Sequence, residues 1–227
     1  MPEEPQQRPS MTSVVIMGLI VISLTNTFWP DTIPFSFFHF WNMKGTLREA
    51  LWHAWPIFAW ATGMTLIGCL TTPRGVKWSR NPRAIFFVGT LTSIWAGITE
   101  ETVFRWIIFY TGIAIYTFVN WCTWGLFALV FSHLLLPVAN FFTLGYLHSL
   151  LFHPLGWTIG AAILSSTGQF RDGHHYLGIV GWLNSWFIGL YFFYLVFTFG
   201  LPAAIAIHII YDLIIFWILA FDAWLYQ

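Results

Sequence analysis

Apolar runs about as long as a membrane-spanning helix follow one another along most of this chain. A spanning helix needs about 20 predominantly apolar residues. Runs of this kind cover residues 11–29, 51–70, 121–140, 180–199 and 201–221. Each predicts a helix in the bilayer, because only helices and closed barrels satisfy their own backbone hydrogen bonds in lipid.

The segments between these runs give a less simple pattern. Residues 84–120 are too long for one ordinary span, and they predict either one very long helix or two helices with a break near Gly97. Residues 30–48 mix aromatic and polar side chains and are expected at the interface. Residues 141–154 could be re-entrant, and the run at 157–169 is short. In total we expect seven or eight helices in the bilayer.

Composition agrees with a membrane protein. The 227 residues are 58% hydrophobic and 8% charged, whereas an ordinary soluble domain carries about 25% charged residues. Aromatic residues make up 21%, which fits the aromatic belts at membrane interfaces. The formal net charge is zero, so nothing indicates nucleic-acid binding. Cys69 and Cys122 lie in apolar runs and form neither a disulfide framework nor a zinc motif.

Basic residues predict how the chain is oriented. The hydrophilic stretch at 71–83 carries four basic residues and no acid. They are Arg74, Lys77, Arg80 and Arg83. By the positive-inside tendency this loop faces the cytoplasm, and two preceding spans then place the N-terminus there too. We expect a multi-pass protein of the plasma (inner) membrane. Residues 1–83 would hold the tail, two spans and this loop, and residues 84–227 a membrane-embedded functional core, within one structural domain overall.

Charged residues almost vanish beyond this loop, and most of those that remain are clustered. Glu100, Glu101 and Arg105 interrupt an apolar run, where each charge costs roughly 2.5–3.5 kcal/mol on insertion scales. On a helix, Glu101 and Arg105 share a face, so that Arg105 can hold Glu101 ionised. Glu100 is turned by about 100° from its neighbour. A carboxyl group near another acid in a dry site can serve as a general base.

Two histidine motifs accompany this acidic pair. His208 and Asp212 are four residues apart in the last apolar run, and therefore share a helical face. His174 follows Phe170 by four residues. A histidine and an acid projecting from one helix toward two carboxylates on another would form a site for activating water. The same groups, Glu100, His174 and His208 among them, could equally bind a divalent metal such as zinc.

The order of these motifs resembles the CPBP family of intramembrane proteases. Glu-Glu-x3-Arg, Phe-x3-His and His-x3-Asp follow one another on separate predicted helices. The family includes type II CAAX prenyl endopeptidases and bacteriocin-processing or immunity proteins. The resemblance covers residues 84–217, and it implies an all-α polytopic bundle with an intramembrane polar cavity. It also implies hydrolysis of a peptide bond in a membrane-associated substrate, either with glutamate-activated water alone or with a bound metal.

The resemblance further implies a role for each motif residue. Glu100 would activate water with help from His174. Glu101 and Arg105 would hold the helix and tune the site. His208 and Asp212 would stabilise the oxyanion. The expected partners are the lipid bilayer and a peptide or protein substrate at the membrane, which could be a prenylated C-terminal peptide, a leader peptide or a transmembrane segment of another protein.

The sequence departs from the family pattern at the second and third motifs. Arg171 and Asp172 lie where the family is usually apolar, and either form a local ion pair that caps the site or belong to a loop. The spacing from Glu100 to His174 is long for the family, which makes His133 and His148 competing candidates. Asp212 stands where the family commonly has Asn, and an ionised Asp accepts hydrogen bonds but cannot donate them.

Two other functions fit the same residues. Buried acids and histidines also build the proton relays of small proton-coupled transporters. Such transporters usually show two related halves, and no internal repeat is evident in this sequence. A non-catalytic immunity or scaffold protein with the same fold is the other alternative.

Overall fold

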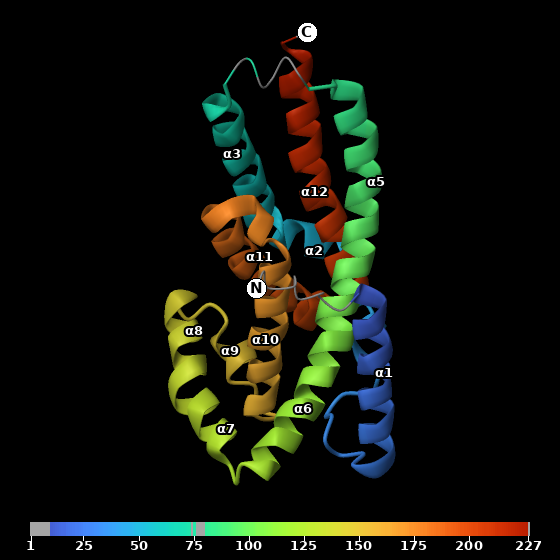
Figure 1. Cartoon of the computed structure of the whole chain (residues 1–227), viewed down its shortest axis with the longest axis vertical. Coiled ribbons are helices and arrows are strands. Elements are labelled where there is room, and N and C mark those ends of the chain that lie inside the picture. The colour runs from blue at the N-terminus through green and yellow to red at the C-terminus, as the bar shows by residue number, and fades with distance from the viewer. Residues whose placement is uncertain (1–9, 74, 76–79, 227) are drawn as a thin grey trace, which may run out of the picture. The chain divides into compact units, whose positions relative to one another are not determined.

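A computed structural model describes residues 10–73, 75 and 80–226 of the chain. Every regular element in these residues is a helix, and no strand occurs among them, which confirms the all-α class (Figure 1). Within the same residues four helices are long and apolar enough to cross a membrane, or up to five if one bent pair is a single span. The chain is therefore consistent with a membrane protein. The larger number of seven or eight bilayer helices stays a prediction.

Most of the predicted spans coincide with helices. Residues 11–29, 180–199 and 201–221 correspond to α1 (Met11–Phe28), α11 (Gly178–Phe199) and α12 (Leu201–Trp224). Residues 51–70 correspond to a pair bent by 51°, α2 (Leu47–His53) and α3 (Trp55–Thr71). Arg74 and Lys77 of the predicted cytoplasmic loop and the tail before Ser10 lie outside the described residues.

The long segment after the basic loop forms one helical run, the first of the two alternatives. Pro82–Cys122 is continuous over 41 residues, with no break at Gly97. It consists of α5 (Pro82–Glu100), the π-helix η2 (Glu101–Ile108) and α6 (Phe109–Cys122). The wider turn thus begins directly at the acidic pair. π-Helical turns inside α-helices are rare and are frequent at functional sites.

Packing divides the chain into two compact units. Unit 1 contains residues 1–37 and 103–187, and unit 2 contains residues 38–102 and 188–227. This grouping by packing does not coincide with the predicted division at residue 83, and that division and the single domain overall stay predictions. Glu100, Glu101, His208 and Asp212 belong to unit 2, whereas Arg105 and His174 belong to unit 1.

Unit 1 is built around α6 and α10 (Trp157–Gly173), which pack against each other. Helix α1 also packs on α6. A shorter hairpin precedes α10, and it contains α7 (Leu126–Val130), the π-helix η3 (Phe131–Leu135), α8 (Leu136–Phe142) and α9 (His148–Leu151). Pro137 explains the wide turn of η3, because proline lacks the N–H that would bond to the carbonyl of residue 133.

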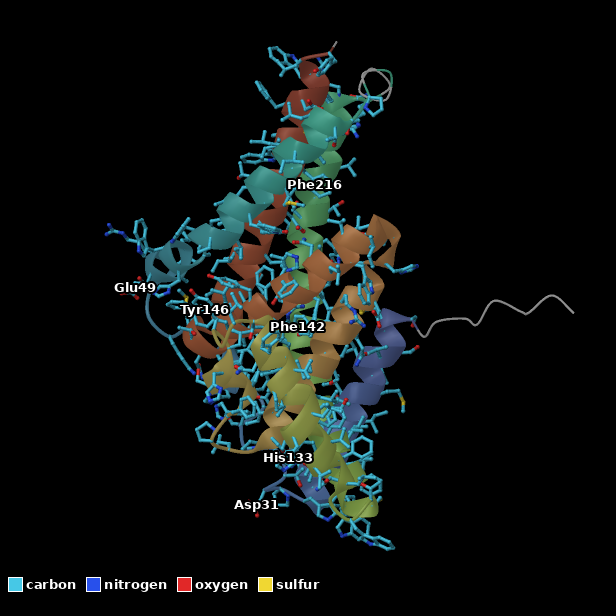
Figure 2. All side chains as sticks on the ribbon, turned by 90° about the vertical axis from the view of Figure 1, so that its left-hand side faces the viewer. Asp31, Glu49, His133, Phe142, Tyr146 and Phe216 are labelled. Atoms are coloured by element: carbon cyan, nitrogen blue, oxygen red, sulfur yellow. The ribbon has the colours of Figure 1, made fainter. Side chains whose placement is uncertain are left out.

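Unit 2 is built on the packing of α12 against α5 and α3 (Figure 1). Small residues one turn apart allow α5 to approach α12 closely. A Cβ atom on Gly97 would lie 2.6 Å from Ile209, and one on Gly89 would lie 2.5 Å from Phe216, which Figure 2 labels on α12. Between these glycines, Ser93 is fully buried, and its hydroxyl donates to the carbonyl of Gly89.

We expect Gly89→Ala to destabilise the protein by about 1–3 kcal/mol, because the added methyl group overpacks a filled interface. Thermal unfolding in detergent measures the effect. The matched control is Gly63→Ala on α3, where an added Cβ meets no atom within 4 Å. The control should be neutral or stabilising by about 0.5–1 kcal/mol, as for any exposed helical glycine. Equal effects at both positions would contradict close packing at Gly89.

Candidate functional site

A buried hydrogen bond joins the two main helices of unit 2 at the acidic pair. The Nδ1 of His208 lies 2.7 Å from the Oε1 of Glu101. The Glu101 side chain is fully buried, and His208 is 4% exposed. Because a carboxylate only accepts hydrogen bonds, the proton of this bond is on Nδ1 when Glu101 is ionised. Glu101 therefore fixes which nitrogen of His208 faces the rest of the site.

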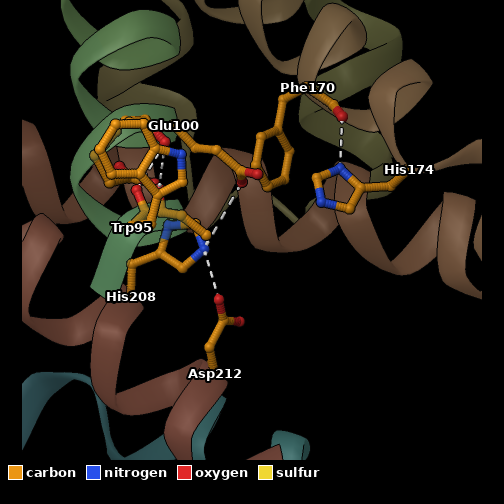
Figure 3. A network of polar contacts seen from close by, with 9 residues as sticks. Trp95, Glu100, Phe170, His174, His208 and Asp212 are labelled. Carbon is orange, nitrogen blue, oxygen red and sulfur yellow. Dashed lines mark hydrogen bonds and ion pairs between the residues drawn. The ribbon is translucent and has the colours of Figure 1, made fainter. Parts of the chain in front are cut away.

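The other ring nitrogen of His208 faces two further carboxylates (Figure 3). Its Nε2 lies 3.9 Å from the Oε2 of Glu100 and 3.7 Å from the Oδ2 of Asp212. Both distances exceed a hydrogen bond but are within reach of charge attraction. The side chains of Glu100 and Asp212 are 22% and 20% exposed. Both side chains are thus more exposed than that of Glu101, although the Oε2 of Glu100 that faces the ring is itself buried.

An aromatic ring from α11 fixes the plane of His208. Phe192 is fully buried and stacks on the imidazole, with ring centroids 4.7 Å apart and an interplanar angle of 21°. Together with the hydrogen bond to Glu101, this stacking leaves the ring little freedom to rotate. Preorganisation of this kind is what a catalytic or binding histidine needs.

The predicted meeting of acids and histidine between two helices is present in unit 2. Glu100 and Glu101 lie where α5 ends and η2 begins, and His208 and Asp212 come from one face of α12. The prediction that His208 and Asp212 share one face of a helix is confirmed, since the Oδ2 of Asp212 lies 3.7 Å from the Nε2 of His208. The sequence did not reveal Phe192, because a phenylalanine in an aromatic-rich run carries no distinguishing signal.

Arg105 of the first motif lies in unit 1 and is fully buried. Its guanidinium carbon lies 4.2 Å from the centre of the Phe170 ring, a cation–π arrangement. Ser166 of α10 donates to the carbonyl of Phe104 at 2.5 Å, within the π-helical turn. Within unit 1, these contacts hold Phe104 and Arg105 against α10. The predicted ion pair between Arg105 and Glu101 stays a prediction.

His174 lies at the end of α10, also in unit 1, and its ring is held by the backbone of the preceding turn. Its Nδ1 donates to the carbonyl oxygen of Phe170 at 2.8 Å (Figure 3). The carbonyl is available because the helix ends here, and the N–H of His174 bonds to Arg171 instead. In the neutral ring, Nε2 is then the proton acceptor. The Phe-x3-His spacing thus sets the orientation of the histidine.

The competing histidines are placed differently. His133 lies on η3 and is exposed (Figure 2), and His148 is exposed and stacks on Phe152, with ring centroids 4.8 Å apart. His153 lies edge-on to Phe35, and burial lowers its pKa. Which histidine serves as the second motif stays a prediction.

The residues do not form a metal cage as they stand. Among the described residues, no group of three or more His, Cys, Asp or Glu side chains is arranged to hold a metal ion. The Nδ1 of His208 is already bonded to Glu101, and the carboxylates of Glu100 and Asp212 lie 3.9 and 3.7 Å from Nε2, beyond metal-ligand geometry with the ring. The predicted zinc alternative therefore finds no support in this donor geometry, and it stays a prediction.

Comparison with protein-family models, with curated proteins and with solved structures found no match for this chain. The resemblance to the CPBP family therefore rests on the motif residues alone.

We expect Glu101→Ala to destabilise the protein by about 1–3 kcal/mol, because it leaves the buried Nδ1 of His208 without an acceptor. Glu101→Gln should lose less, because its amide oxygen can still accept this bond. The midpoint of thermal unfolding measures both effects. Glu100→Ala is the matched control, since Glu100 is partly exposed and lies beyond hydrogen-bond distance of His208. A larger loss in the control than in Glu101→Ala would contradict the role of Glu101.

Proposed function

We propose that the chain is an intramembrane endopeptidase of the CPBP type. The observation that carries the proposal is the cluster of Glu100, Glu101, His208 and Asp212 on two apolar helices of unit 2. Ionisable groups are costly in such segments, and where they occur they are usually functional. The order of the three motifs along the chain supports the same proposal.

In the proposed reaction, Glu100 is the general base that removes a proton from water. Its partly exposed carboxylate can reach a water molecule, unlike the buried Glu101. The hydroxide forms a bond to the carbonyl carbon of the peptide. His174 would assist Glu100, and its held Nδ1–H leaves Nε2 as the proton-accepting nitrogen.

His208 is proposed to stabilise the oxyanion that develops on the peptide carbonyl. Its Nδ1–H is committed to Glu101, so donation to the oxyanion needs a second proton on Nε2. The carboxylates of Glu100 and Asp212, within 4 Å of Nε2, compensate the resulting positive charge before the attack, and Asp212 and Glu101 still do so after Glu100 has taken the proton from water. When the tetrahedral intermediate collapses, the C–N bond breaks and the leaving amine takes the proton from Glu100. Preorganised donors of this kind contribute a large share of catalysis.

The proposed substrate is a membrane-associated peptide, either prenylated or bearing a leader, reached from the bilayer. The proposed setting is the plasma (inner) membrane with a cytoplasmic N-terminus, as the basic residues near position 77 indicate. The polar cavity around the cluster is part of this proposal.

A proton-coupled transporter is the second candidate. It is favoured by the same cluster, because carboxylates on both sides of one imidazole can pass a proton between them. Substrate-driven flux in proteoliposomes without peptide cleavage would select the transporter. The scaffold or immunity alternative would hold if the protein neither cleaved peptides nor transported substrate, and if a Glu100 variant still conferred the cellular phenotype of the parent protein.

We expect Glu100→Gln and His208→Ala to lower kcat by about 10²–10⁴-fold, because each removes a group that acts in the transition state. Cleavage of quenched fluorescent peptides in proteoliposomes measures this, with one farnesylated peptide and one leader-like peptide. Glu49→Gln is the matched control, since Glu49 caps the distant helix α2 and Gln can make the same capping bond. Full cleavage by both site variants would refute the proposed peptidase.

The same assay tests which histidine belongs to the second motif and assists Glu100. His174→Ala is expected to lose about 10²-fold or more of kcat, as for a general-base assistant. The controls are His133→Ala and His148→Ala, which make the same substitution at two exposed histidines of unit 1. Loss of cleavage in one of these controls, with His174→Ala active, would move the second motif to that residue and leave the enzyme class unchanged.

A further inference from the structure

The two charged residues inside the second motif form a clamp at the end of α10. Arg171 Nε and Nη2 each lie 2.8 Å from the Oδ1 of Asp172. The indole Nε1–H of Trp182, ten residues further on, donates to the same oxygen at 3.0 Å. The guanidinium also lies over the Trp182 ring, 4.0 Å from its centre. The Arg171–Asp172–Trp182 clamp therefore combines a charge-assisted pair with a cation–π contact.

The clamp closes the reversal that carries His174. Helix α10 ends at Gly173, and α11 begins at Gly178, which has a positive φ of 74°. Asp172 belongs to the first helix, and Trp182 belongs to the first turns of the second. Their hydrogen bond joins the two ends of the turn that contains His174.

The backbone carbonyls of Arg171 and Asp172 also stabilise this turn. The carbonyl of Arg171 accepts the N–H of His174 at 2.9 Å, and the carbonyl of Asp172 accepts Nδ1–H of His175 at 3.0 Å. A shift of the Asp172 backbone would therefore move the last turn, from which His174 reaches back to Phe170. The clamp and the hydrogen bond of His174 share one short segment.

We propose that Asp172 and Trp182 are positioning residues that keep the Nδ1 proton of His174 on the Phe170 carbonyl and present its Nε2 for proton transfer. This inference rests on the proposed function for its catalytic consequence. An exposed ion pair contributes little to stability by itself. The clamp is expected to act on the orientation of His174 more than on folding.

The test is Trp182→Phe, which keeps an aromatic ring under Arg171 but removes the N–H donor. Trp186→Phe is the matched control, one turn further along α11, because the Trp186 Nε1 has no hydrogen-bond partner among the described residues. Asp172→Ala, which removes the acceptor, and the double variant Asp172→Ala/Trp182→Phe complete the set. Cleavage of the farnesylated and leader-like peptides is measured with thermal unfolding and with ¹⁵N NMR of the His174 ring.

We expect Trp182→Phe to lower kcat about three- to tenfold with KM and the unfolding midpoint unchanged, and Trp186→Phe to match the parent. The double variant should be no worse than Asp172→Ala alone, because Asp172→Ala already removes the hydrogen bond that Trp182→Phe removes. The NMR spectrum of Trp182→Phe should show the His174 ring as a mixture of tautomers.

The two proposals fail in different ways. If the parent protein cleaves no peptide but Trp182→Phe loses the single His174 tautomer, the clamp holds and the peptidase proposal fails. If the parent is active and Trp182→Phe keeps both its kcat and the single tautomer, the clamp proposal is wrong. The clamp proposal would also be wrong if Trp182→Phe lowered both kcat and the midpoint of thermal unfolding but left the His174 tautomer unchanged. Trp182 would then act on folding stability and not on the orientation of His174.

Discussion

The close approach of α5 and α12 is the constraint on which the cluster in unit 2 depends. Gly89, Ser93 and Gly97 follow one another at four-residue spacing, and the same spacing continues to Glu101. Without side-chain bulk on this face, the helices come near enough for a short carboxylate to reach His208 at 2.7 Å. In lipid, packing of small residues and interhelical hydrogen bonds replace the hydrophobic effect as the source of helix association. The polar contact and the close packing therefore support each other.

Burial divides the acidic pair into two different groups. Glu101 is enclosed and bonded to one nitrogen of His208, whereas Glu100 remains partly exposed on the side of the other nitrogen. Neighbouring residues on a helix point about 100° apart, so a single pair of identical residues supplies one structural and one accessible carboxylate. This asymmetry is the strongest physical reason for giving Glu100 the reacting role and Glu101 the supporting one.

Both histidines of the proposed mechanism are held through Nδ1, but by different partners. A buried carboxylate holds His208, and a backbone carbonyl at a helix end holds His174. A carboxylate can balance a charged imidazole, whereas a carbonyl only fixes the tautomer. The difference matches the proposed division of work, in which His208 faces negative charge and His174 exchanges a proton.

The sequence by itself determined the helical class, most of the long helices and the pairing of His208 with Asp212 on one face, because these follow from apolar run length and from the helical period. It could not determine the π-helical turn at Glu101, since no proline marks that turn as Pro137 marks η3, and the wider turn there depends on the surroundings of the helix. It also gave no sign of Phe192 beside His208 or of Trp182 beside Asp172. Those contacts join segments that are distant along the chain or separated by a reversal, and only tertiary packing selects one aromatic ring among many similar ones.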